Sequence, residues 1–248
     1  MPSHPLFYQS LVPLHRDRHR DWKLAQGEGR HGFAAGSHVI PAVVDEFGAA
    51  LAHLPIVFAP SEPRPTTVFL VGVRPAQNLF VDADGRWTGG YIPAFVRRYP
   101  FMRGEVEGGS AVTCIDERSA LLSTDDGEAL FDAQGQESPL LRTTMELVES
   151  YYQAAQRTER FLDMVQELQL LRNVTIETQM GPGSSALIHG FMTIDEDKLG
   201  AIDATDFLRL RDAGFLPAIY AHLYSLRAVD TLRRAVADAA EAAQDDAA

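Results

Sequence analysis

Hydrophobic and polar positions change their period about half-way along the chain, and the two halves predict different kinds of structure. In the first half, short apolar runs rich in branched and aromatic residues alternate with proline- and glycine-rich turns, as is typical of strands. In the second half, apolar residues recur at spacings of three, four and seven, as on the buried face of a helix. We therefore expect an α+β protein: a single compact domain with an antiparallel β-rich N-terminal half and a helical C-terminal half that contains one further β-hairpin.

The first half predicts a series of short strands that follow a polar, proline-punctuated arm over residues 1–30. Pro41 opens a short helix, in which Val43, Val44, Phe47 and Leu51 have helical spacing. The turn signals are Asp-Ala-Asp-Gly at 82–85 and a second hairpin at 129–135. The expected strands are 33–35, 39–40, 55–58, 66–73, 78–81 and 111–115.

The second half predicts a long helix, a hairpin and two further helices. Ser138 and Pro139 are a good N-cap and first helical residue. Residues 173–179 and 187–194 read as antiparallel strands around a Gly-Pro-Gly-Ser turn, one later helix runs from Asp203 to Gly214, and the last begins near Pro217. We assign residues 1–236 to one domain and 237–248 to a frayed acidic, alanine-rich tail, and the chain shows no internal repeat.

Composition narrows the classes of protein that the chain can represent. The 248 residues carry 22 Lys and Arg against 34 Asp and Glu, a net charge of −12, which argues against nucleic acid as a partner. No apolar run approaches the roughly 20 residues that would insert in a membrane. A single cysteine excludes an intrachain disulfide. Because no apolar segment follows a basic start, we expect a cytoplasmic protein, and a homo-oligomer stays open.

The segment Tyr-Ile-Pro-Ala-Phe-Val-Arg-Arg-Tyr-Pro-Phe, residues 91–101, is the main candidate for a binding site. Arg97 and Arg98 stand among aromatic residues, where a guanidinium needs a carboxylate, a carbonyl or a ring to face. One interpretation is a buried ion pair between these arginines and a carboxylate of the first helix, Glu46. The other is a site in which the arginines hold an acidic small molecule or an unknown protein. The full candidate set is Arg97, Arg98, Tyr91, Trp87, Glu46 and His38.

A metal site is the alternative. His15 and Asp17 form an H-x-D triplet, which non-haem iron oxygenases use together with a distant histidine. His189 or His222 could supply that third ligand, and Arg97 could hold an oxo-acid. Since the triplet lies in the polar arm, a solvated basic arm is the favoured interpretation, and we expect no cofactor.

Several motifs together carry a resemblance to a known family. The matching stretches are Phe33-Ala34-Ala35 with Pro41 and Glu46-Phe47, Leu54-Pro55-Ile56-Val57-Phe58, the run from Asn78 to Trp87, the segment 91–101, Cys114-Ile115-Asp116, Gly127 to Gly135, and Tyr220-Ala221-His222-Leu223-Tyr224-Ser225-Leu226. On these stretches the chain resembles the SapC family from about residue 6 to residue 230.

The resemblance implies a link to a surface-layer (S-layer) protein operon and supplies no catalytic residues. Relatives are encoded near flavin-dependent tryptophan halogenases, cupin-like proteins and TonB-dependent receptors. We therefore expect an accessory or binding protein of a surface-layer or tailoring pathway rather than an enzyme. An iron-dependent tailoring oxygenase is the alternative, and a subunit of a surface assembly is a third possibility.

Overall fold

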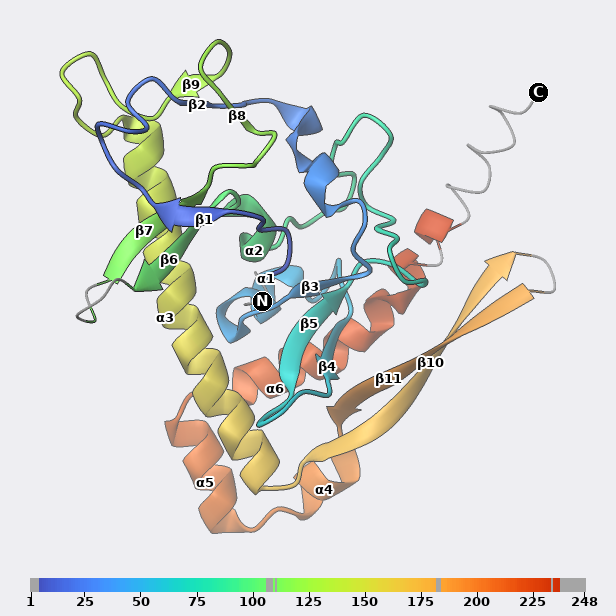
Figure 1. The fold of residues 1–248 in the computed structure, drawn as a ribbon. Coiled ribbons are helices and arrows are strands. Elements are labelled where there is room, and N and C mark those ends of the chain that lie inside the picture. The colour runs from blue at the N-terminus through green and yellow to red at the C-terminus, as the bar shows by residue number, and fades with distance from the viewer. Residues whose placement is uncertain (1–4, 106–108, 110, 182–183, 233, 237–248) are drawn as a thin grey trace.

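A five-stranded antiparallel sheet forms the centre of the molecule (Figure 1). The computed structural model describes residues 5–105, 109, 111–181, 184–232 and 234–236. The sheet order is β10 (Leu171–Gly181), β11 (Ser184–Ile194), β4 (Ile56–Ala59), β5 (Thr66–Leu70) and β3 (Val39–Pro41). The residues of β4 are buried apart from half-buried Ala59, since other elements cover both of its faces.

Two smaller antiparallel sheets lie at the other end of the molecule. One has the order β1 (Leu11–Pro13), β7 (Ala111–Asp116) and β6 (Phe101–Glu105). The other has the order β8 (Leu122–Ser123), β2 (Lys23–Leu24) and β9 (Glu128–Ala129). The N-terminal arm is therefore paired with strands from the middle of the chain.

The long helix α3 (Pro139–Glu167) runs past both groups of sheets (Figure 1). The Ser138 hydroxyl accepts a hydrogen bond from the Leu141 amide (3.1 Å), and Pro139 opens the helix, so the sequence-predicted cap is confirmed. The other helical elements are η1 (Glu28–Ala34), η2 (Val44–Glu46), α1 (Phe47–Ala50), α2 (Ala94–Arg97), α4 (Glu196–Ala201), α5 (Ala204–Asp212), α6 (Leu216–Ser225) and η3 (Leu226–Ala228). None of the described helices is both long and apolar enough to cross a membrane.

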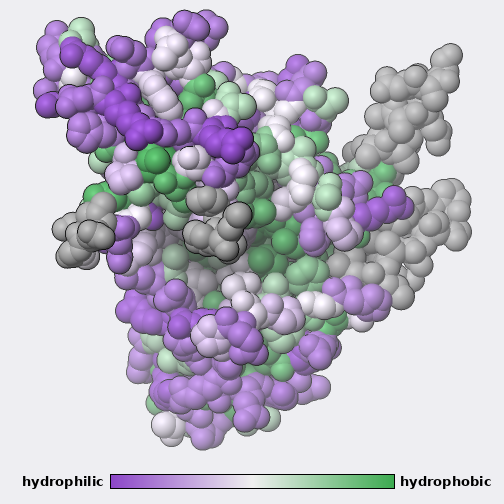
Figure 2. Space-filling model, in the orientation of Figure 1, coloured by the Kyte–Doolittle hydropathy of each residue, from purple (hydrophilic) through white to green (hydrophobic). Residues whose placement is uncertain are grey.

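Two hydrophobic clusters share α3. The larger surrounds the central sheet and takes Phe161 and Val165 from the C-terminal half of α3. The smaller takes Leu141 and Val148 from its N-terminal half and packs them against the two small sheets. Figure 2 shows hydrophilic side chains over α4 and α5, and apolar residues reaching the surface nearer the middle of this face.

His222 fastens α6 to the central sheet. Its Nδ1 donates to the Ile56 carbonyl (2.9 Å), and its Nε2 accepts from the Ile194 amide (3.1 Å) and the Thr193 hydroxyl (2.9 Å). This pattern fits the neutral ring, and burial lowers the pKa of His222 to about 4. The imidazole is part of the fold.

The α+β fold expected from the sequence is confirmed, with three local exceptions. Pro41 was expected to open the first helix, but it pairs as the last residue of β3, and the helical residues begin at Val44. Residues 33–35 were expected as a strand, but Phe33 and Ala34 end the 3-10 helix η1. Gly29 and Gly85 explain this, because their backbones approach so closely that a Cβ on either would lie 2.6–2.8 Å from a carbonyl oxygen. The expected tail 237–248 and the turn residues Pro182 and Gly183 lie outside the described residues.

The third exception is the expected strand at 78–81. There the buried Asn78 side chain, instead of a neighbouring strand, bonds to the backbone. It donates to the Ala34 carbonyl (3.1 Å) and accepts from the Phe80 amide (3.0 Å). Within residues 78–81, the strand pairing is limited to one isolated bridge, between Val81 and Trp87.

Two turns have the same geometry, although no repeat was expected from the sequence. Asp82 and Asp132 each begin an Asp-Ala-x-Gly turn, accept a backbone amide four residues on through the side chain, and are followed by a glycine with φ of 75° or 74°. Each turn is closed by an isolated bridge, Val81 to Trp87 or Phe131 to Glu137. The first turn holds η1 through the bond from the His31 amide to the Gly85 carbonyl (2.8 Å), and the second leads into the N-terminus of α3. The two turns therefore position η1 and α3, which face each other across the site described next.

Candidate functional site

Arg98 is enclosed by aromatic rings inside the protein. Its side chain is 6% exposed, and the guanidinium carbon lies 4.5 Å from the ring centre of Phe95, 4.2 Å from that of Tyr151 and 5.8 Å from that of Tyr8. Within the described residues Arg98 forms no ion pair, and its Nε has no hydrogen-bond partner. Three ring contacts, each contributing roughly 0.5–2 kcal/mol, stabilise the charge instead of a carboxylate.

Glu46 does not form the ion pair that was considered for it. Its Oε1 accepts from the Tyr91 hydroxyl (2.8 Å) and from the amide of Ala94 (2.6 Å), the first residue of α2. The side chain is buried, and burial raises the pKa of Glu46, while these two bonds and the charge of Arg97 act in the opposite direction. Glu46 thus ties the first helical segment to the segment 91–101, as expected, but through a phenol and an amide rather than an arginine.

Three further candidates, Tyr91, Trp87 and His38, pack close to the pocket but are not among the residues that line it. Tyr91 is held by Glu46, and burial raises the pKa of its phenol. Trp87 stacks on Phe80 with ring centres 6.1 Å apart and meets the His31 ring edge-on at 6.3 Å. His38 lies between η1 and β3, where its carbonyl accepts from the backbone of residues 71 and 72. Of the six candidates, Arg97 lines the pocket described next.

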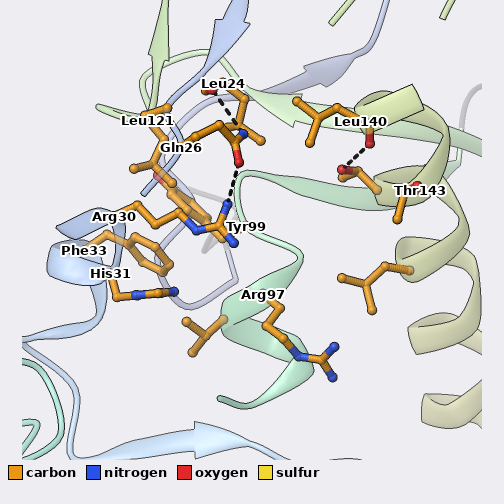
Figure 3. A pocket seen from close by; sticks show the side chains of 14 residues that line it. Leu24, Gln26, Arg30, His31, Phe33, Arg97, Tyr99, Leu121, Leu140 and Thr143 are labelled. Carbon is orange, nitrogen blue, oxygen red and sulfur yellow. Dashed lines mark hydrogen bonds between the residues drawn. The ribbon is translucent and has the colours of Figure 1, made fainter. Parts of the chain in front are cut away.

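This pocket, of about 360 Å³, lies between η1, α2 and the first half of α3 (Figure 3). Arg97 is exposed, and its Nε donates to the Ile92 carbonyl (3.0 Å). Arg30 extends from η1, where its guanidinium donates to the Gln26 side chain (3.5 Å). In the described part of the chain neither arginine forms an ion pair with a carboxylate.

His31 adds a buried polar group to the same pocket. The residue is 7% exposed, and its Nδ1 forms no hydrogen bond with any described residue. Burial lowers the pKa of His31, and the charge of Arg30 lowers it further, while the backbone of Glu28 acts in the opposite direction. In Figure 3 the ring points from η1 into the pocket. The Trp87 ring meets the His31 ring edge-on, with centres 6.3 Å apart.

The electrostatic character of the pocket is opposite to that of the whole chain. The chain has a net charge of −12, yet none of the described residues that line the pocket carries a carboxylate. Two guanidinium groups without a carboxylate partner favour an anion, since a charge-assisted hydrogen bond is about twice as strong as a neutral one. The chemistry that the pocket can perform is therefore the binding of a negative group.

The apolar lining comes from both hydrophobic clusters. Leu24 and Leu140 belong to the smaller cluster, whereas Val96, Tyr99 and Phe33 belong to the larger one. Leu140, Thr143, Thr144 and Leu147 present one face of α3, because their spacing of three and four is that of a single helical face. The pocket is thus at the junction of the two clusters.

The residues of the metal alternative lie in separate elements. His15 and Asp17 are in the connection between β1 and β2, where the Asp17 amide donates to His15 Nδ1 (3.2 Å). His189 is on β11 beside Thr175 (3.1 Å), and His222 is bonded within the core. Among the residues that the structure describes, no group of three His, Cys, Asp or Glu side chains is placed to hold a metal.

Comparison with known proteins identifies the family. The SapC family model matches residues 14–232. The chain belongs to the SapC family. No curated protein and no solved structure matches this SapC-family chain. The matched range contains the whole lining of the pocket, from Leu24 to Leu147.

Sequence reasoning singled out Arg97 but not the residues that share its pocket in this SapC-family protein. Arg30 and His31 stand in a segment that was assigned to a polar arm and a following strand. Thr143, which is exposed, and Thr144, which is half-buried, lie on a predicted helix. One signal was available: the two glycines Gly29 and Gly32 beside these residues are typical of a close backbone approach.

Proposed function

We propose that this SapC-family protein is an accessory binding protein that holds an acidic partner in the pocket formed by η1, α2 and α3. Arg97 provides the central contact, as the sequence suggested, and Arg30 provides a second. Following the family resemblance, we extend the proposal to a cytoplasmic accessory role in a surface-layer or tailoring pathway. No catalytic step is assigned to the protein.

One observation carries the proposal: two arginines without a carboxylate partner line a pocket that has no acidic residue in its described lining. Several arginines of this acidic protein pair with carboxylates of the same chain. Arg157 pairs with Asp45, and Arg209 pairs with Glu167 (2.9 Å). An anion from outside would give Arg30 and Arg97 the partner that the fold gives to those other arginines.

Thermal unfolding of the purified protein in a panel of anions tests the proposal. The panel contains acetate, inorganic phosphate, citrate and a hexaglutamate peptide, each at low ionic strength because salt screens exposed charges. We expect at least one anion to raise the melting temperature of the wild type and to leave that of Arg97→Gln unchanged. Arg160→Gln is the control, since Arg160 is exposed on α3 and does not line the pocket.

Two results would overturn the proposal. One is that no anion of the panel changes the melting temperature of the wild type. The other is that the wild type and Arg97→Gln respond equally, which would show that the anions act elsewhere on the surface.

A further inference from the structure

The pocket has an apolar end as well as a charged end. In Figure 3 Leu24, Leu121 and Leu140 lie at one end, while His31 and Arg97 lie at the other, with Arg30 between them. The three leucines belong to the smaller hydrophobic cluster, so the apolar end of the pocket is in contact with that part of the core. A small ion such as phosphate would leave this end in contact with water.

The charged end offers three different nitrogen groups. Arg30 and Arg97 supply fixed positive charge, and the buried His31 ring supplies a polar atom that no described residue satisfies. Unsatisfied buried polar atoms are uncommon in folded proteins, and this one belongs to a ring that points into the pocket (Figure 3). Arg30 and Arg97 thus supply two positive charges for one carboxylate that lies between them.

The backbone around the pocket argues for a small molecule rather than a peptide. An extended peptide binds by adding a strand to a free sheet edge. The strand that borders the pocket, β2, is already paired on both sides, with β8 and with β9. The volume of about 360 Å³ also lies at the lower end of the range for small-molecule pockets.

We infer that the pocket binds a small amphipathic carboxylic acid, with its carboxylate between Arg30 and Arg97 and its apolar body against the leucines of the smaller cluster. This inference rests on the proposed function and names the class of ligand. Bound in this way, the acid touches both hydrophobic clusters, and its binding energy contributes to holding them together.

Isothermal titration calorimetry with a series of straight-chain acids tests the inference. Acetate, butanoate, hexanoate and octanoate share one carboxylate and differ in apolar length, and hexanamide keeps the length of hexanoate without the charge. We expect affinity to rise about fourfold for each methylene that enters the pocket, until the apolar end is filled. Hexanamide should bind at least tenfold more weakly than hexanoate.

Variants separate the two ends of the pocket. Arg97→Gln and Arg30→Gln should each weaken hexanoate by about tenfold or more and leave hexanamide nearly unchanged. Leu140→Asn should reduce the gain per methylene, because Leu140 is half-buried on the pocket face of α3 and belongs to the smaller cluster. Arg160→Gln should bind all ligands as the wild type does.

The outcomes distinguish this inference from the proposed function. If acetate binds as tightly as hexanoate and Arg97→Gln abolishes both, the pocket is a plain anion site, and the inference fails while the proposed function stands. If hexanamide binds as tightly as hexanoate, the arginines play no part and both fail. If no acid of the series binds, the inference fails, and the anion panel decides the proposed function separately.

Discussion

Arg97 and Arg98 are neighbours in the chain, and their side chains lie in opposite environments. Arg98 is enclosed by Phe95, Tyr151 and Tyr8, and is 6% exposed. Arg97 is exposed, bonds to one carbonyl and borders a pocket with Arg30. The difference arises because Arg97 is the last residue of the four-residue helix α2 and Arg98 is its C-cap, and adjacent side chains of a helical turn point in different directions.

The comparison shows that a pair of adjacent arginines need not be one site. The aromatic residues of the segment 91–101 serve Arg98, so they belong to the fold. Arg97 is exposed, and the residues that share its pocket lie on η1 and α3. A test that treats the two arginines alike would confuse the stability of the protein with its binding.

The largest expected effect is on stability at Arg98. We expect Arg98→Ala to lower the free energy of unfolding by on the order of 3–4 kcal/mol, because it removes three ring contacts and leaves a cavity. Arg98→Met fills most of that space without a buried charge, and its loss should be clearly smaller. Arg97→Ala should change stability by less than about 0.5 kcal/mol. Urea unfolding at pH 7 measures all three, and equal losses for Arg97→Ala and Arg98→Ala would remove the distinction between the two residues.

The two buried histidines also lie in different environments. Their effect on the free energy of unfolding as the pH falls is expected to be no larger than that of Arg98→Ala. His222 has hydrogen-bond partners at both nitrogens, whereas His31 has an unpartnered Nδ1 in the pocket. Because the folded pKa of His222 is about 4 and its unfolded pKa is about 6.5, the unfolded chain binds the proton first. The stability from this residue is therefore complete above pH 6.5 and is lost as the pH falls toward 4, by on the order of 3 kcal/mol.

Unfolding measured at several pH values between 7 and 4 checks this expectation. The lowered pKa of His31 acts with the same sign, so the His222→Gln variant should keep a weaker slope rather than none. A wild-type stability that does not fall below pH 6.5 would contradict the account of the His222 network.

The parts of the fold that could be predicted are those set by local signals. Ser138, Pro139 and the apolar spacing after them fix α3, and Asp203 and Gly214 bracket α5 in the same way. The hairpin of β10 and β11 follows from alternation along each strand. In each case the decisive residues lie within a few positions of one another.

The parts that could not be predicted depend on contacts between distant residues. The Gly29 and Gly85 backbones meet and turn an expected strand into η1, which carries Arg30 and His31 to the pocket. Likewise, the rings around Arg98 come from the N-terminal arm and from α3 as well as from its own segment. The sequence shows that Arg97 needs a partner, but the residues that share its pocket appear only when η1 and α3 are placed.

Arginine side-chain NMR with hexanoate tests most directly whether Arg97 binds and Arg98 supports the fold. The Nε–Hε signals of the wild type are assigned with Arg97→Gln and Arg98→Met and then followed during titration. The account predicts that the signals of Arg97 and Arg30 move with a common saturation curve while that of Arg98 stays in place. A saturating shift at Arg98 with none at Arg97 would contradict it.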